Sequence, residues 1–260
     1  MRKLMKLALE EEQIQIKSQY SRFDGYEIHL YGNLKDDFSL SHIISKPIIT
    51  VHYPIARCDV NDVVNEFETE YAQKVYAFCK KVDAGLVIHA ETGVDRLVTN
   101  PHLEKFCKFI CEQGIRLHVE NCYRNIGAIQ GLKLTKFLQK QIGEDQVFPL
   151  LDTCHLMMSE MSFKFEEMSF FKTIEAYASD NYVVHLNDCI GSGEKETGGI
   201  HGTNFYANRY LLGNILWKLH ELEDQGTHVD LVLEVDEFDY VYPSNADILA
   251  KNVDLIWSSI

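Results

Sequence analysis

The 260-residue chain has no apolar run near the roughly 20 residues that a membrane-spanning helix requires. Its seven cysteines include no Cys-x-x-Cys pair, and their odd number disfavours a disulfide framework, so we expect a reducing, cytoplasmic setting. Basic residues are scarce, 25 against 39 acidic ones, and the net charge of −14 disfavours non-specific adhesion to nucleic acid. With 46% apolar and 25% charged residues, the composition excludes a disordered or low-complexity chain.

Eight short, β-rich runs follow one another along the chain, and the later ones are almost continuously apolar. This composition is typical of strands that are buried on both faces, as in parallel sheets. The runs are Leu4–Leu9, Gly25–Leu30, Ile48–His52, Gly85–His89, Ile115–Glu120, Val147–Asp152, Tyr182–His185 and Val229–Glu234.

Helical periodicity fills most intervals between these runs. The expected helices are Val63–Lys81, Pro101–Gln113, Ile129–Ile142, Phe165–Ala178, Tyr210–Asp224 and Ala246–Ser258. Asn100 is suited to cap the second of them, with Pro101 at its first position. Strand ends from His52 to His185 recur roughly every 31–37 residues, without a linker-like stretch. This alternation predicts an α/β fold in one domain over residues 1–260, a parallel, eight-stranded (β/α)8 TIM barrel.

The interval between His185 and Glu234 is longer than the others because it contains the glycine-rich segment Cys189–Phe205. A bare connection does not need this length, so we expect a functional loop that moves over the site.

Six of the eight runs end in a residue that can bind a metal ion. These residues are His52, His89, Glu120, Asp152, His185 and Glu234. Taken singly, each is also explained as a cap for the next helix or a partner for a loop amide. Six such ends in phase with the strand repeat favour a shared site, because the strands of a parallel barrel all end at one rim. Histidine and carboxylate are costly to bury without partners, so the pattern predicts a metal centre there.

Three further polar residues fit the same rim. His155 follows Asp152 by three positions and is placed to hold a substrate oxygen or a second ion. Asp188 follows the seventh strand, where it can support a ligand. His201 lies in the glycine-rich segment, either as a ligand or as an exposed loop histidine.

Taken together, the strand-end motifs resemble the xylose isomerase-like barrel superfamily. The motifs are His52-Tyr-Pro, Val-Ile-His89-Ala, His-Val-Glu120-Asn, Leu-Leu-Asp152-Thr-Cys-His155, Val-His185-Leu-Asn-Asp and Leu-Val-Leu-Glu234. This superfamily holds sugar phosphate isomerases and epimerases as well as endonuclease IV-like abasic-site nucleases (AP endonuclease family 2). The resemblance covers essentially the whole chain.

The resemblance implies a shared metal quartet, formed by Glu120, Asp152, His185 and Glu234. Three carboxylates and one imidazole suit Zn²⁺ or Mn²⁺, and also Mg²⁺ or Co²⁺. In the nuclease branch, His52 and His89 would join Glu120 around a further zinc ion, and the equivalents of His155 and His201 would serve a third.

The first functional hypothesis is a divalent-metal-dependent isomerase or epimerase of a small sugar or sugar-phosphate-like hydroxy carbonyl compound. The ion would act as a Lewis acid and stabilise an enediolate. Glu120 and Glu234 would be the catalytic acid/base pair, since removing and returning a proton on opposite faces needs two groups. His155 would hold a substrate oxygen. In a simpler version both glutamates are ligands only.

The alternative is a zinc-dependent endonuclease IV-like phosphodiesterase that acts on abasic sites in DNA repair. His52 and His89 favour this hypothesis. The Asp-x-His pair of those nucleases reads Gly199-Ile-His201 here, so its aspartate is missing. The acidic net charge also counts against tight duplex binding. An inactive barrel that binds a small ligand is the third hypothesis.

The expected partner is a small-molecule substrate, with nucleic acid only under the nuclease hypothesis and no membrane. Aromatic-rich helices around Trp217 would cover the barrel or form a homo-oligomer contact. Cys122, Cys154 and Cys189 each lie within a few residues of a proposed ligand, and the sequence leaves their roles unassigned.

Overall fold

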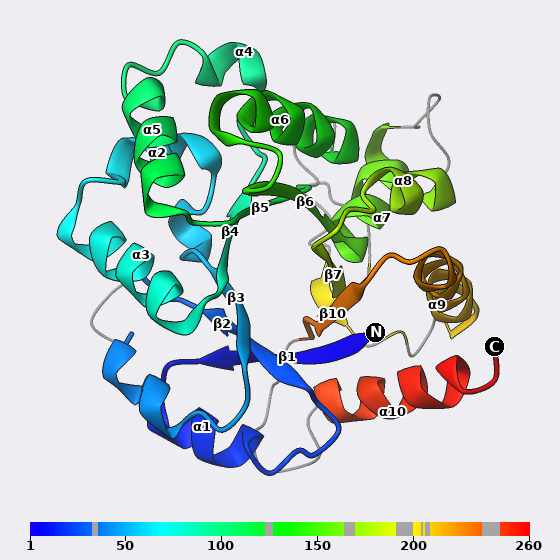
Figure 1. Ribbon diagram of the computed structural model, residues 1–260. Coiled ribbons are helices and arrows are strands. Elements are labelled where there is room, and N and C mark those ends of the chain that lie inside the picture. Colours follow the sequence, from blue (N-terminus) through cyan, green and yellow to red (C-terminus); the bar gives the residue numbers. More distant parts are fainter. Residues whose placement is uncertain are drawn as a thin grey trace.

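A closed barrel of parallel strands forms the centre of the described chain (Figure 1). The computed structural model describes residues 1–32, 36–122, 127–163, 170–190, 200–203, 205, 209–235 and 245–260; for residues 159–163, 189–190 and 200–203 it describes the backbone alone. Around the barrel the strands follow in the order β1, β10, β7, β6, β5, β4, β3, β2. The predicted eight-stranded parallel TIM barrel is confirmed.

The strand bounds agree closely with the apolar runs of the sequence. The barrel strands are β1 (Arg2–Ala8), β2 (Gly25–His29), β3 (Ile48–His52), β4 (Gly85–His89), β5 (Leu117–Glu120), β6 (Val147–Asp152), β7 (Tyr182–Leu186) and β10 (Val229–Leu233). These runs form strands because β-branched and aliphatic side chains can pack on both faces of a covered sheet.

A small apolar cluster fills the inside of the barrel. It consists of Leu4, Val87, Leu150, Val183 and Val232, none of them more than 1% exposed. Four of these five stand two positions before a predicted metal ligand, so they face the interior one layer below it. The larger apolar core lies between the strands and the surrounding helices. The polar residues at the strand ends therefore lie directly above this apolar cluster, which keeps water out of the barrel interior beneath them.

Helices surround the barrel on its outer side (Figure 1). They are α1 (Glu11–Lys17), α2 (Val60–Glu66), α3 (Glu70–Val82), α4 (Val94–Leu97), α5 (Leu103–Gln113), α6 (Gly127–Ile142), α7 (Thr153–Phe163), α8 (Phe170–Ala176), α9 (Arg209–Asp224) and α10 (Asn245–Trp257), with 3₁₀ turns η1 (Phe38–Ile43) and η2 (Ile55–Arg57). Helices α1, α4 and α7 lie where the sequence pattern predicts none. None of the described helices combines the length and apolarity that crossing a bilayer requires.

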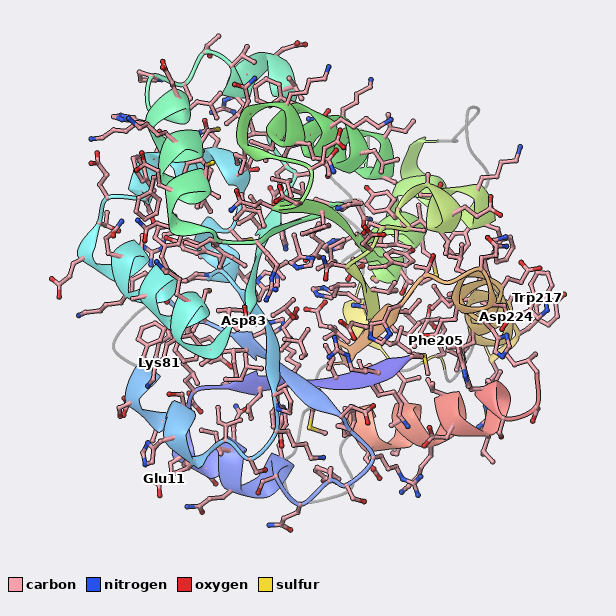
Figure 2. The ribbon with its side chains drawn as sticks, viewed as in Figure 1. Glu11, Lys81, Asp83, Phe205, Trp217 and Asp224 are labelled. Carbon is pink, nitrogen blue, oxygen red and sulfur yellow. The ribbon has the colours of Figure 1, made fainter. Side chains whose placement is uncertain are left out.

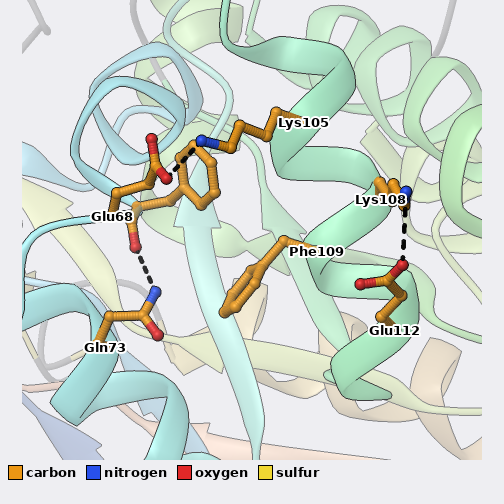
Figure 3. Close-up of a pocket in the computed structure, with 7 residues that line it drawn as sticks. Glu68, Gln73, Lys105, Lys108, Phe109 and Glu112 are labelled. Carbon is orange, nitrogen blue, oxygen red and sulfur yellow. Dashed lines mark hydrogen bonds and ion pairs between the residues drawn. The ribbon is translucent and has the colours of Figure 1, made fainter.

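The single helix expected over Val63–Lys81 is wrong, because the chain breaks between α2 and α3. The side chain of Thr69 accepts a hydrogen bond from the backbone N–H of Ala72 at 3.2 Å and so starts a new helix. The break leaves a surface groove against α5, where Phe109 faces the α2–α3 junction (Figure 3). An ion pair between Lys105 and Glu68 closes one end of this groove.

Two other helix starts differ from the expected ones. Asn100 does not cap a helix at Pro101, since α5 begins at Leu103. The Asn100 side-chain carbonyl instead accepts from the backbone N–H of His102 at 2.9 Å, and its amide donates to Asn61 of α2 at 2.9 Å. Asn100 thus ties two helices together. The helix expected over Phe165–Ala178 starts outside the described residues, and its described part is α8.

The segment between β7 and α9 contains a short antiparallel pair, β8 (Asp188–Ile190) and β9 (Ile200–Thr203). Residues 191–199, which the sequence predicts as a loop over the site, lie outside the described residues. On the neighbouring α9, Trp217 lies at the outer edge of the molecule, away from the barrel (Figure 2). Its side chain is 52% exposed.

Candidate metal centre

All six predicted strand-end residues gather at one end of the barrel. They are His52, His89, Glu120, Asp152, His185 and Glu234, and none is more than 7% exposed. Neighbouring strands hold them in register, with His89 beside Glu120 and Asp152 beside His185. Side chains alternate between the two faces of a strand, so strand-end residues that are paired in register and face the interior come together above the apolar cluster.

Four of these residues surround one point. The ligand atoms of Glu120, Asp152, His185 and Glu234 all lie within 4.8 Å of one another. Nδ1 of His185 lies 3.0 Å from Glu234 Oε2, 3.3 Å from Glu120 Oε2 and 4.0 Å from Asp152 Oδ2. The imidazole nitrogen thus stands between three carboxylates, which is the donor set of an oxygen-rich divalent metal site.

Two buried atoms of this group support a cation. Glu120 Oε2 and His185 Nδ1 have no hydrogen-bond partner among the described residues. Leaving such polar atoms buried without partners costs free energy, and a carboxylate oxygen costs most. A divalent ion at their common centre would satisfy both atoms, so the residues present fit a metal ion.

Glu27 of β2, which the sequence pattern did not single out, sets the orientation of His185. Its Oε2 lies 3.1 Å from His185 Nε2 and accepts a hydrogen bond from the Thr50 hydroxyl at 2.7 Å, while Oε1 lies 2.7 Å from Nε2 of His29. Burial opposes ionisation of Glu27, but His185 and His29 outweigh burial and lower its pKa. An ionised Glu27 accepts a hydrogen bond from the Nε2–H of His185, and this leaves Nδ1 to bind a metal ion.

Asp152 serves two purposes at once. Its Oδ1 accepts a hydrogen bond from the backbone N–H of His155 at 2.5 Å, which caps the first turn of α7. Its Oδ2 accepts from the amide of Asn187 at 2.9 Å and faces the shared centre. Asn121 fixes the Asp152 backbone, accepting from its N–H at 2.7 Å and donating to its carbonyl at 3.1 Å. The capping and ligand interpretations of Asp152 are therefore compatible.

A second group lies beside the first. The ligand atoms of His52, His89 and Glu120 are within 4.8 Å of one another. Nε2 of His52 and Nε2 of His89 are 3.1 Å apart, and each is 3.4 Å from Glu120 Oε2. Nδ1 of His52 donates to the Tyr53 carbonyl at 2.6 Å. Glu120 Oε2 is shared by both groups.

His155 lies at the edge of this cluster. Its Nδ1 donates to the Asn121 carbonyl at 2.8 Å and lies 3.3 Å from Glu120 Oε1. Burial disfavours the charged ring, but Asp152 and Glu120 outweigh burial and raise the pKa of His155 to about 10. A charged His155 ring can donate a second hydrogen bond through Nε2.

Interactions between opposite charges determine the pKa values of Glu120 and His185. Burial raises the pKa of Glu120, but His89 and His185 outweigh that effect and hold it well below the usual range. Burial likewise opposes charge on His185, whereas Glu27, Glu120 and Glu234 raise its pKa well above the ordinary value. Glu120 is therefore held in its ionised form, which can bind a cation.

The remaining predicted residues are placed as follows. His201 lies on β9, and its side chain is outside the described residues. Asp188 is buried at the start of β8. Cys122 and Cys154 are buried and form no disulfide with any described cysteine, and the side chain of Cys189 lies outside the described part.

Besides Glu27, the sequence pattern missed Lys6, His29 and Thr50. Lys6 Nζ lies 3.8 Å from Glu234 Oε1, and His29 Nε2 lies 4.0 Å from the same oxygen. All of them sit within strands rather than at predicted strand ends. Glu27 and His29 are two positions apart and therefore share one face of an otherwise apolar strand. This spacing is the sequence pattern that could have indicated their role at the site.

No protein-family model and no curated protein sequence matches this chain. Solved structures do share its architecture. A D-tagatose 3-epimerase-like protein matches with a TM-score of 0.59 and 16% identity, covering 100% of this chain and 99% of that one. A xylose isomerase domain protein from Salmonella typhimurium matches with a TM-score of 0.54 and 16% identity over 98% and 96%. Endonuclease IV from Thermus thermophilus matches with a TM-score of 0.56 and 14% identity over 100% of both chains.

These likenesses establish the fold. The predicted resemblance to xylose isomerase-like barrels, with epimerases and endonuclease IV among them, is confirmed at that level.

Proposed function

We propose that the chain is a divalent-metal-dependent isomerase or epimerase acting on a small sugar or sugar-phosphate-like hydroxy carbonyl compound. The observation that carries the proposal is that two buried atoms of the quartet at the barrel rim, Glu120 Oε2 and His185 Nδ1, have no hydrogen-bond partner among the described residues. A likeness in fold to epimerase structures agrees with it.

Glu120, Asp152, His185 and Glu234 would hold the ion, which we expect to be Mn²⁺ or Zn²⁺, with Mg²⁺ or Co²⁺ as further options. When bound, such an ion polarises a substrate carbonyl and stabilises the negative charge that develops on its oxygen. Glu27 would keep Nδ1 of His185 available by accepting the Nε2–H.

Glu120 and Glu234 would move the proton. Two strands, β6 and β7, separate β5 from β10, so the two carboxylates reach the centre from different sides. Oε2 of each lies near His185 Nδ1, at 3.3 Å and 3.0 Å, so we assign the proton transfer to Oε1 of each, which for Glu120 lies 3.3 Å from His155 Nδ1. Lys6 Nζ lies 3.8 Å from Glu234 Oε1, close enough to attract negative charge on that oxygen.

His155 would bind a substrate oxygen. Its Nδ1 is committed to the Asn121 carbonyl, so Nε2 is the atom available to substrate. A ring with a pKa near 10 donates a hydrogen bond, which suits an oxygen that gains negative charge during proton transfer.

A zinc-dependent, endonuclease IV-like phosphodiesterase is the second candidate. The group formed by His52, His89 and Glu120 favours it, because it supplies a further set of ligands beside the quartet. Against it stand the glycine at position 199, where those nucleases carry aspartate, and the net charge of −14.

Two parallel assays on the metal-loaded protein separate the candidates. The first measures uptake of solvent deuterium by a panel of ketoses and their phosphates. The second measures cleavage of abasic-site DNA, and elemental analysis counts the ions in each chain. Deuterium uptake without cleavage supports the isomerase, whereas DNA cleavage with two or three zinc ions per chain would overturn it.

A further inference from the structure

A third group of ligand-type side chains lies on the outer side of His89. One ligand atom each of His89, Glu91 and Cys122 lies within 4.8 Å of the other two. His89 Nδ1 is 3.8 Å from Glu91 Oε1. The thiols of Cys122 and Cys58 are both within hydrogen-bonding reach of this ring, but only Cys122 also groups with Glu91. None of the four quartet residues belongs to this group.

The tautomer of His52 decides which nitrogen of His89 faces the new group. Since a carbonyl oxygen only accepts, the 2.6 Å contact to Tyr53 makes Nδ1 of His52 the donor. Nε2 of His52 is then an acceptor, and the His89 Nε2 that lies 3.1 Å away must donate to it. With Nε2 donating to His52, Nδ1 is the His89 nitrogen that can bind an ion, and it faces Glu91 rather than the quartet.

The backbone around the group is fixed before any ion arrives. Asp59 Oδ1 accepts from the N–H of Glu91 at 3.0 Å and of Thr92 at 2.8 Å, holding the turn after β4. The N–H of Ala90 donates to the Glu120 carbonyl at 3.0 Å, which ties this turn to the strand end that precedes Cys122. Cys122 is 2% exposed, whereas the Glu91 side chain is 27% exposed and leaves a path for an ion.

We propose that His89 Nδ1, Glu91 and Cys122 form a separate, thiolate-containing binding site for a zinc-like divalent ion. One thiolate and one carboxylate neutralise its charge, and the Cys122 thiol proton and the Nδ1 proton of a charged His89 ring pass to solvent when the ion binds. Three protein ligands leave the fourth tetrahedral position for water. The sulfur ligand selects a softer ion than the oxygen-rich quartet does.

This assignment also limits the neighbouring group. The His89 ring offers one lone pair when neutral, so an ion on Nδ1 leaves Nε2–H facing His52 and Glu120. An ion at the thiolate site therefore withholds His89 from the ligand set that the nuclease hypothesis needs. The proposal does not depend on which reaction the quartet performs.

Cobalt provides the test, because a thiolate bound to Co²⁺ gives a near-ultraviolet charge-transfer absorption that oxygen and nitrogen ligands do not. Metal-free protein is titrated with Co²⁺ under a thiol-free reductant, and bound ions are counted. We expect the absorption in the wild type. Cys122→Ser should lose it together with one ion, and Glu91→Gln should weaken that binding by about tenfold or more.

Two variants serve as controls, with folding checked by circular dichroism. Cys154→Ser removes another buried thiol at the same rim and should keep the absorption. Glu234→Gln should lose the quartet ion but keep the absorption. The proposal is overturned if wild-type protein binds Co²⁺ without the absorption, if Cys122→Ser retains it, or if Cys154→Ser loses it.

Discussion

Glu27 Oε2 lies 3.1 Å from Nε2 of His185, and both side chains are fully buried. Thr50 donates to the same Glu27 oxygen at 2.7 Å. A carboxylate that accepts from the far side of a ligand histidine fixes the ring tautomer and increases the basicity of the nitrogen that faces the metal. The quartet thus depends on a residue that does not belong to it.

Glu27→Gln should weaken divalent metal binding by about 10- to 100-fold, because a neutral amide no longer fixes His185 with Nδ1 deprotonated. Calorimetric titration of metal-free protein with Mn²⁺ or Zn²⁺ measures the change. Thr50→Val is the matched control, since it removes one donor to Glu27 but keeps the carboxylate. Equal losses in the two variants would show that packing, and not the carboxylate, is responsible.

Metal removal should lower thermal stability. An ion that binds only the folded chain and is present at about 100 times its Kd adds about 2.7 kcal/mol. For a domain of this size, that corresponds to roughly 5–10 °C in Tm. Asp152→Asn should abolish the increment, because it removes a ligand charge while the amide oxygen can still cap α7. Differential scanning calorimetry with and without chelator checks this, and an unchanged metal increment in the variant would contradict the ligand assignment.

Glu120→Gln and Glu234→Gln should each reduce substrate proton exchange by about 10²–10⁴-fold or more, since an amide neither takes nor returns a proton and also weakens binding of the quartet ion. The measurement is deuterium uptake from solvent, followed by mass spectrometry of the substrate. Glu112→Gln on the outer face of α5 is the control, because its carboxylate pairs only with Lys108 among the described residues. If either rim variant keeps full exchange, the acid/base pair is wrongly assigned.

The fold and the rim were predictable because the two signals are local. An apolar run followed by a histidine or carboxylate marks both a strand and its C-terminal end, as at His52 or Asp152. The sequence did not predict a role for Glu27 at the site because its carboxylate lies inside a strand. Only the closed barrel brings β2 close to His185. The break between α2 and α3 before Thr69 was not predicted because the helical periodicity of the sequence continues across it.

Other features could not be predicted from the sequence because they depend on contacts between residues far apart in the chain, as two helical glycines show. Gly131 on α6 and Gly213 on α9 look alike in the sequence, as each lies within a continuous helix. An added Cβ at Gly213 meets nothing within 4 Å. At Gly131 it would overlap the Tyr177 hydroxyl and approach Asn121 Cα to 3.3 Å. The hydroxyl cannot move freely, because it donates to the Ala128 carbonyl at 2.6 Å.

Gly213→Ala should therefore raise the free energy of unfolding by about 0.5–1 kcal/mol, since alanine loses less conformational entropy in a helix. Gly131→Ala should lower it by about 1–3 kcal/mol through overpacking. It should also weaken metal binding, because Asn121 positions the backbone of Asp152. Urea denaturation and metal titration of both variants measure the two effects. A stabilising Gly131→Ala with unchanged metal affinity would contradict the close packing of α6 on the site.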